Sequence, residues 1–136
     1  MKTWVEKREA EKQHQVKVNP KTFADMPSGC MMLIPTPKIV DKFVKQIDRG
    51  NFVYSKDLRT TMALDYKSDN SCPLVTGISL RIISEAAYEE YEFGTKNEDI
   101  TPFWRAVEPF SKLAYKLTCG VDFILKYQDK EGIYLI

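Results

Sequence analysis

The sequence has little histidine, no closely spaced cysteine pair and no long apolar run. His14 is its one histidine, and Cys30, Cys72 and Cys119 stand far apart in the chain. Structural zinc sites need closely spaced Cys and His pairs, and a thiol or hydroxyl nucleophile needs a nearby base. We therefore expect no metal, no cofactor and no disulfide framework, and the composition disfavours a Cys–His or Ser–His catalytic pair.

The lack of long apolar runs helps to predict where in the cell the protein is found. No run approaches the roughly 20 apolar residues that a membrane-spanning helix needs. The first residues, MKTWVEKREAEKQHQ, are charged throughout and lack the apolar core of a secretory signal. We therefore expect a cytoplasmic protein without a membrane partner, and nucleoid association is compatible with that location.

Neither sign of charge is in large excess, because 20 basic and 19 acidic residues leave a net charge of +1. The signs are unevenly placed: residues 38–59 hold six basic and three acidic side chains, and residues 85–99 hold six acidic ones and one lysine. A uniformly basic nucleic-acid binder is excluded, whereas a protein with one basic face is not. Solvated helix faces of opposite sign would explain the same pattern.

Helical periodicity covers most of the 136 residues. Thr36 and Pro37 are typical of a helix start, and apolar residues then recur at helical spacing up to Gly50. Similar patterns predict further helices over about residues 56–66, 72–94, 110–117 and 120–130. Over residues 72–94 the expected inward-facing set is Leu74, Val75, Ile78, Ile82 and Ala86, with Ile83 left open.

We expect the N-terminal quarter of the chain to differ in structure from the rest. Residues 1–35 are expected to form a helical or extended arm that packs on a domain made by residues 36–136. Within the arm, the apolar residues 30–34 predict a strand or an extended entry to the next helix, and residues 133–136 allow a final strand. The fold class is therefore mainly α, in one structural domain.

The stretch ITPFWRAVEP, residues 100–109, places Phe103, Trp104 and Arg105 between two prolines. A buried strand with an aromatic pair and the floor of a site are both open interpretations. The residues on either side of the stretch help to decide between these two interpretations.

Two helices joined by a tight turn, the second entered through Pro73, have the outline of a helix-turn-helix. With their surroundings, residues from about Ile39 to Gly132 resemble the C-terminal, DNA-binding domain of the O6-alkylguanine-DNA alkyltransferases and of the alkyltransferase-like proteins. The same parts follow in the same order: an amphipathic helix, Ile-x-x-Gly, a short helix around Leu58, a helix with Gly77 in its first turns, a Pro-x-x-Arg loop and a final Glu-Gly. The resemblance implies a winged-helix (helix-turn-helix) fold and double-stranded DNA as partner.

The loop of the family reads Pro-Cys-His-Arg-Val in the alkyltransferases, where the Cys accepts the alkyl group, and carries Trp for Cys in the alkyltransferase-like proteins. Here Phe103 falls on the reactive cysteine and Trp104 on the histidine that would activate it. Alkyl transfer needs a thiolate and a nearby base, so we expect no enzyme. Glu131 falls on the carboxylate of the family's proton relay and is expected to pair with Arg105.

The resemblance implies a base pocket made of Pro102, Phe103, Trp104, Arg105 and Glu131. An equally open alternative makes the two aromatics core residues and leaves Arg105 to brace Glu131. The glycine-rich segment that follows the loop in the family is replaced by Phe-Ser-Lys-Leu at residues 110–113. This loss weakens the case for base flipping more than the case for the fold.

The resemblance also implies a DNA face, with further departures. Leu74 falls where the family has an arginine that enters the duplex, and a wedge at a base step competes there with a buried core leucine, which we favour. Ser55 falls on the nucleotide-rotating tyrosine, with Tyr54 one place before it. The expected DNA-binding residues are Tyr54, Ser55, Lys56, Arg59, Leu74, Gly77 and Arg81, helped by Lys38, Lys42, Lys45 and Arg49.

Lysine and arginine side chains on phosphates supply affinity that does not depend on base sequence. Each of these cations also has the plain alternative of an ordinary exposed side chain. For Arg81 a second alternative is an i, i+4 ion pair with Glu85.

Three hypotheses for function follow. The leading one is a non-catalytic, alkyltransferase-like DNA-binding protein that recognises alkylated or damaged bases for repair. The second keeps the winged-helix scaffold but gives it a protein or small-ligand partner, through the acidic, tyrosine-bearing residues 88–92 and the N-terminal arm. The third makes Cys30 or Cys72 a relocated nucleophile, although no base is in sight. Cys72 would stand near a helix N-terminus, which lowers the pKa of a thiol.

Overall fold

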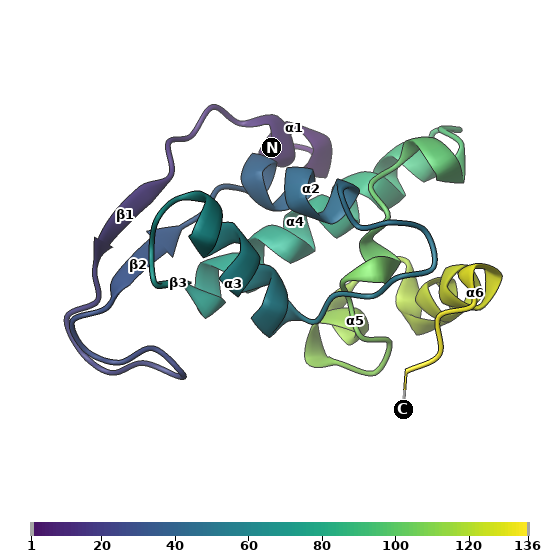
Figure 1. Ribbon diagram of the computed structural model, residues 1–136. Coiled ribbons are helices and arrows are strands. Elements are labelled where there is room, and N and C mark those ends of the chain that lie inside the picture. Colours follow the sequence, from purple (N-terminus) through teal and green to yellow (C-terminus); the bar gives the residue numbers. More distant parts are fainter. Residues whose placement is uncertain (1, 136) are drawn as a thin grey trace.

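Helix α4 (Pro73–Glu92) runs through the middle of the molecule, and three other helices and a 3-10 turn, α1, α2, α3 and η2, pack along it (Figure 1). The computed structural model describes residues 2–135, and within them the chain is mainly helical with a small three-stranded sheet. The remaining elements are, in chain order, α1 (Trp4–Glu9), β1 (Gln15–Val18), β2 (Met31–Ile34), α2 (Pro37–Lys45), α3 (Ser55–Asp65), β3 (Asn70–Ser71), the 3-10 turns η1 (Asn97–Asp99) and η2 (Phe103–Arg105), α5 (Lys112–Lys116) and α6 (Gly120–Glu131).

The sheet lies at one end of the molecule and α6 at the other (Figure 1). Strand β1 pairs antiparallel with β2, and β2 pairs parallel with the short β3. The predicted strand over residues 30–34 is thus confirmed, and its Leu33 is fully buried. Residues 133–135 form no strand, and residue 136 lies outside the described chain.

The helix boundaries follow the local sequence. The Thr36 hydroxyl accepts a hydrogen bond from the Ile39 amide, and Pro37 is the first residue of α2, as predicted. Helix α2 ends at Lys45, however, and Gly50 takes a left-handed φ of 89° in the turn beyond it. Helix α3 follows the helix predicted over about residues 56–66, with Tyr54 at its cap position. Gly132, with φ of 72°, ends α6 close to the predicted boundary at about residue 130.

Two large buried clusters make up most of the core, and a small third cluster joins Met26, Met32 and Cys72. The first joins β2, α2, α3 and the middle of α4 through ten buried residues. The second joins the far half of α4 to η2, α5 and α6 through nine. Ala106 belongs to the first cluster, and Phe103, Trp104 and Val107 belong to the second. The loop around η2 therefore connects the two halves of the core.

The orientation of α4 differs from the prediction. Leu80, Ile83 and Ala87 are at most 2% exposed, whereas Leu74 is 60% and Ile78 is 52% exposed. The inward-facing set predicted for this helix was therefore wrong at Leu74 and Ile78, whereas Val75 is half-buried against the third cluster and Ala86 is fully buried. Small polar residues, among them Thr76 and Ser79, take buried places instead. An apolar stripe on the first half of α4 is left uncovered.

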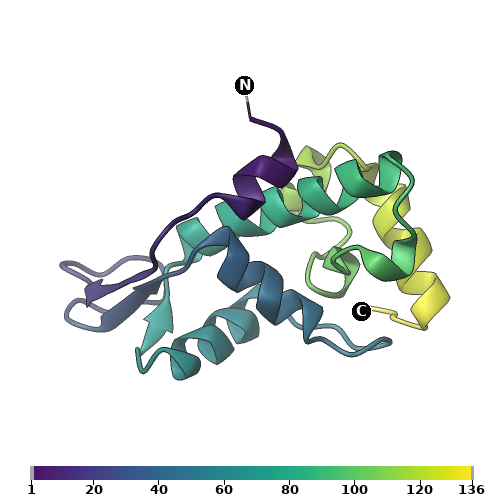
Figure 2. The same cartoon turned by 90° about the horizontal axis from the view of Figure 1, so that it is seen from above.

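Helix α1 crosses α4 and fixes the start of the N-terminal arm (Figure 2). The Glu89 carboxylate accepts hydrogen bonds from the backbone amides of Trp4 and Val5, each at 3.2 Å. The guanidinium of Arg8 donates to both oxygens of Glu90, at 2.8 and 3.3 Å. Two acidic residues of the stretch 88–92 are thus used inside the chain.

Candidate functional site

The loop that the sequence singled out is a 3-10 turn rather than a strand. The Ala106 amide donates to the Phe103 carbonyl at 3.0 Å, which closes the turn. Phe103 is fully buried and stacks on Phe123, with ring centroids 5.8 Å apart and planes within 4°. The rings of Phe103 and Trp104 meet edge to face, with their centroids 5.6 Å apart. No open face of Phe103 is left for a base.

Trp104 is held on both its apolar and its polar side. Its ring stacks on Tyr127 at 4.8 Å, and its indole Nε1 donates to Oε2 of Glu131 at 2.8 Å. The side-chain amide of Gln128 donates to the Trp104 carbonyl at 2.9 Å. Phe103 and Trp104 are therefore core residues, which is one of the two interpretations that the sequence left open.

The Arg105–Glu131 pair braces the loop. Arg105 Nε donates to Glu131 Oε1 at 2.8 Å and Nη2 donates to Oε2 at 2.9 Å, while Nη1 donates to the Ile47 carbonyl at 2.7 Å. The Gly50 amide also donates to Glu131 Oε1, at 3.0 Å. One carboxylate therefore ties together the loop, the end of α6 and the turn after α2.

The Glu131 carboxylate stays ionised. Its side chain is 2% exposed, and burial alone would raise its pKa. The hydrogen bonds from Arg105, Gly50 and Trp104 outweigh burial, and the pKa of Glu131 lies below its ordinary value. A carboxylate saturated with donors is suited to holding a loop, not to passing a proton.

A polar cleft of about 480 Å³ opens beside this brace. Four of the five residues expected in a base pocket, all except Phe103, contribute to its wall. The rest of the wall comes from Lys45, Arg49 and the residues 97–100 around η1. The space is therefore bounded by charged groups of both signs, and the Trp104 side chain on its wall is only 2% exposed.

The residues at the start of α3 are exposed. Tyr54 is 42% exposed and rests edge-on against Phe52, and Ser55 and Lys56 are exposed as well. Lys56 is thus a solvent-exposed cation in the first turn of α3.

Arg59, expected on the same face, is not available to a phosphate. Its side chain is 8% exposed and donates to both carboxylate oxygens of Asp25, at 3.0 and 2.6 Å. It also donates to the Ser71 carbonyl at 3.2 Å. Its partner Asp25 lies in the loop between β1 and β2, 34 residues earlier, and no pattern in the sequence predicts the pair.

Leu74 and Gly77 do lie on an open surface. The exposure of Leu74 overturns the core interpretation that we had favoured for it. A side chain built on Gly77 would meet no atom within 4 Å, so nothing inside the chain requires glycine there.

Arg81 does not pair with Glu85. The Glu85 carboxylate instead accepts from the Thr118 amide and hydroxyl, at 3.1 to 3.3 Å. The guanidinium of Arg81 lies 5.5 Å from the centroid of the Trp4 ring, and its Nε is buried without a hydrogen-bond partner. The sequence of α4 alone could not have predicted this contact between Arg81 and Trp4 of α1.

The supporting cations of residues 38–49 are mostly engaged. Lys38 pairs with Glu11 and Lys45 with Asp41, each at 3.0 Å, and Arg49 reaches Glu131 at 3.7 Å. Lys42 lies over the Phe43 ring at 5.9 Å. The local excess of positive charge in the sequence is thus largely neutralised in the fold.

The cysteines show no activated thiol. All three are free; Cys72 is buried, and Cys30 and Cys119 are half-buried. Burial, helped by the nearby Glu85 carboxylate, raises the pKa of Cys119 to about 12. His14 packs against the Tyr66 ring at 4.5 Å, and within residues 2–135 it forms no hydrogen bond with a cysteine.

Within the described chain, no group of three or more His, Cys, Asp or Glu side chains is arranged to hold a metal ion. No helix among residues 2–135 is long and apolar enough to cross a membrane. No family model matches the chain, and comparison with curated proteins and with solved structures gave no significant match. The function is therefore inferred from the residues themselves.

Proposed function

We propose that this chain is a non-catalytic, alkyltransferase-like protein that binds double-stranded DNA with a winged-helix domain. In this proposal α3 and α4 are the helix-turn-helix, and the first half of α4 is the recognition helix. Its place would be the cytoplasm, including the nucleoid. The observation that carries the proposal is the uncovered start of α4, with Leu74 60% and Ile78 52% exposed.

Gly77 supports the same use of this surface. Glycine in the middle of a helix costs about 1 kcal/mol relative to alanine. No neighbour within 4 Å would clash with a side chain at this position, so packing inside the chain does not explain the residue. Close approach of an external backbone, such as that of a nucleic acid, does explain it.

The absence of catalysis is proposed from the loop. Phe103 stands where the resemblance implies the acceptor cysteine, and it is fully buried. Arg105, Trp104 and Gly50 occupy the Glu131 carboxylate, which leaves it no role in a proton relay. Within the described residues, none of the three cysteine thiols hydrogen-bonds a side-chain base, and burial with the nearby Glu85 carboxylate raises the pKa of Cys119 to about 12.

The packed aromatics also bear on lesion recognition. A flipped base needs an aromatic or apolar face on which to stack, and the faces of Phe103 and Trp104 are taken by Phe123 and Tyr127. We therefore expect plain duplexes and duplexes with O6-methylguanine to bind with equal affinity.

The test is a salt-titrated binding assay with both duplexes and two matched variants. Leu74→Asp adds a negative charge to the proposed interface, and Phe93→Asp adds the same charge at an apolar side chain that is 87% exposed at the far end of α4. We expect Leu74→Asp to weaken binding at least about tenfold, through repulsion by phosphates, and Phe93→Asp to leave it within about twofold. Failure of the unaltered protein to bind any duplex at low salt would refute the proposal. Preference for the O6-methylguanine duplex would mean that the loop opens for a base.

The second candidate is the same scaffold with a protein partner. One observation favours it: four of the seven cations expected on or near the DNA face, Arg59, Lys38, Lys45 and Arg49, are paired with carboxylates within the chain. A surface poor in free cations gives weak, non-specific DNA affinity. The assay above separates the candidates, because a protein-binding scaffold would show no salt-dependent affinity for duplex DNA.

A further inference from the structure

A groove of about 500 Å³ runs along the first half of α4, and three elements line it. The floor is α4 itself, with Leu74, Gly77 and Ile78. Trp4 and Lys7 of α1 form one side, and Leu113 and Lys116 stand on the side of α5. The N-terminal arm therefore contributes to the same surface as the proposed recognition helix.

The charged lining of this groove has one sign only. Its ionisable side chains are Lys7, Arg81 and Lys116, and among the described lining residues there is no carboxylate. Each of the other arginines forms an ion pair. A carboxylate oxygen lies within 4.0 Å of the guanidinium in Arg8, Arg49, Arg59 and Arg105. Within residues 2–135, Arg81 is the one arginine that lacks such a partner.

The environment of Arg81 suggests a missing anion. Its Nε is buried and makes no hydrogen bond, and a buried unpaired donor is costly. Its guanidinium and the Lys7 ammonium both lie against the Trp4 ring, at 5.5 and 4.2 Å from the centroid. Two cations on one ring repel each other, and an anion in the groove beside them would relieve this repulsion.

Helix α1 is built to hold Lys7 in place. Thr3 and Glu6 form a capping box at its start, and the Glu89 carboxylate binds the amides of Trp4 and Val5. The acidic residues of α4 thereby fix a helix of the arm next to the groove. The position of Lys7 is set by these contacts rather than by a free tail.

We propose that α1 and α5 extend the DNA interface of α4, with Lys7, Arg81 and Lys116 binding the phosphates of one strand beside the recognition helix. The inference rests on the proposed function and names the part of the ligand that this groove holds. Cations that flank a recognition helix and contact the backbone are the usual means of fixing its register on a duplex. An acidic amphipathic helix of a protein would fit the same charges. The duplex is favoured because Leu74 and Gly77, which belong to the proposed recognition surface, form the groove floor.

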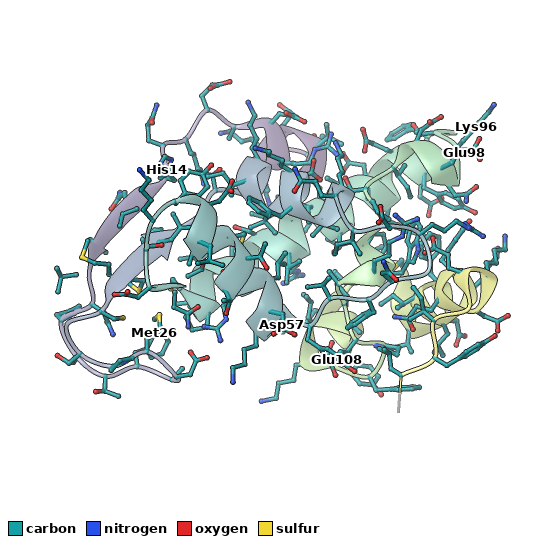
Figure 3. The ribbon with its side chains drawn as sticks, viewed as in Figure 1. His14, Met26, Asp57, Lys96, Glu98 and Glu108 are labelled. Atoms are coloured by element: carbon teal, nitrogen blue, oxygen red, sulfur yellow. The ribbon has the colours of Figure 1, made fainter. Side chains whose placement is uncertain are left out.

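The experiment measures DNA affinity as a function of salt for the full chain and for Lys7→Gln, Lys116→Gln and the control Lys96→Gln. Lys96 follows the far end of α4 and is exposed there, as Figure 3 shows, so it lies remote from the groove. Each phosphate contact contributes about 0.9 to the slope of log affinity against log salt between about 50 and 200 mM. We expect Lys7→Gln and Lys116→Gln each to lower this slope by about 0.9, and Lys96→Gln to leave it unchanged.

The outcomes separate the two proposals. If the unaltered chain binds DNA and the two groove variants keep its slope, the inference is wrong while the DNA-binding function stands. If neither the unaltered chain nor any variant binds DNA, the DNA-binding function and the inference about the groove are both wrong. If Lys7→Gln and Lys116→Gln leave DNA binding intact but weaken binding of a synthetic glutamate-rich amphipathic helix, the groove is a protein site. Circular dichroism melting of each variant, expected within about 1 °C of the unaltered chain, checks that the substitutions leave the fold intact.

Discussion

Arg105 and Glu131 lie side by side, with Nε 2.8 Å from Oε1 and Nη2 2.9 Å from Oε2, although 26 residues separate them in the chain. The planar guanidinium matches both carboxylate oxygens, which is the strongest geometry for such a pair. Because the same carboxylate also accepts from Trp104 and Gly50, one side chain connects the η2 loop to the ends of two helices.

Glu131→Gln is expected to destabilise the fold strongly. The substitution keeps the shape of the side chain but leaves the guanidinium of Arg105, 14% exposed, without its main counter-ion. Breaking one partner of a buried pair costs about 3 kcal/mol or more. Urea denaturation should therefore show a loss of about 3 kcal/mol. Asp129→Asn, which neutralises an exposed carboxylate on the same helix, should change stability by less than about 0.5 kcal/mol, and an equal effect of the two would contradict the brace.

The same carboxylate should give stability a specific pH dependence. The folded-state pKa of Glu131 is below the ordinary carboxyl value of 4.5, so folding favours its ionised form. Its contribution is complete above the unfolded-state pKa and is lost as the pH falls through the folded-state pKa. The difference in unfolding free energy between the unaltered chain and Glu131→Gln should be constant from pH 7 to about pH 5.5 and shrink below about pH 4.5. Urea midpoints of both proteins across this range measure it, and a constant difference down to pH 3 would contradict it.

The sequence predicted the local features of the fold because they depend on neighbouring residues. Thr36 and Pro37 specify the start of α2 through a hydroxyl cap and a missing amide donor, and Gly132 specifies the end of α6 through a left-handed backbone. The apolar stripe of α2 also has only one possible inward face. These signals need no knowledge of distant residues.

Helix α4 was less predictable because it is apolar on more than one side. Leu74 and Ile78 define one stripe and Leu80 and Ile83 another, and periodicity cannot choose between two apolar faces. The choice is made by α2 and α3, which cover the second stripe. Among the candidate site residues, Arg59 was misread for a similar reason, since only the folded chain brings its distant partner to it.

The two leucine stripes of α4 can be compared directly. Leu80 is 2% exposed in the first core cluster, and Leu80→Ala should cost about 3 kcal/mol from lost burial and the cavity left behind. Leu74→Ala, an identical substitution at a side chain that is 60% exposed, should change stability by less than about 0.5 kcal/mol. Urea denaturation of the two variants measures both. A large loss for Leu74→Ala would mean that this surface is covered in the folded protein.

Phe103→Cys places a thiol where the resemblance implies an acceptor, and it should not create an alkyltransferase. The thiol would be enclosed by the Phe123 ring and the rest of the second core cluster, and burial raises a thiol's pKa. The neighbouring Trp104 can neither remove the proton nor stabilise a thiolate, because an indole is a donor only. Incubation with a duplex containing O6-methylguanine, followed by mass spectrometry, should show no methyl group moved from the guanine oxygen to the sulfur.

The same substitution should lower stability by about 3 kcal/mol, because most of a fully buried aromatic ring is removed. Phe110→Cys is the matched control, since Phe110 is 66% exposed and its replacement should cost less than about 0.5 kcal/mol. Stability lost without methyl transfer is the result expected of a loop whose aromatics serve the core. Methyl transfer to the substituted side chain would instead show that a base can reach this position, and the packed state of the loop would then be one of two conformations.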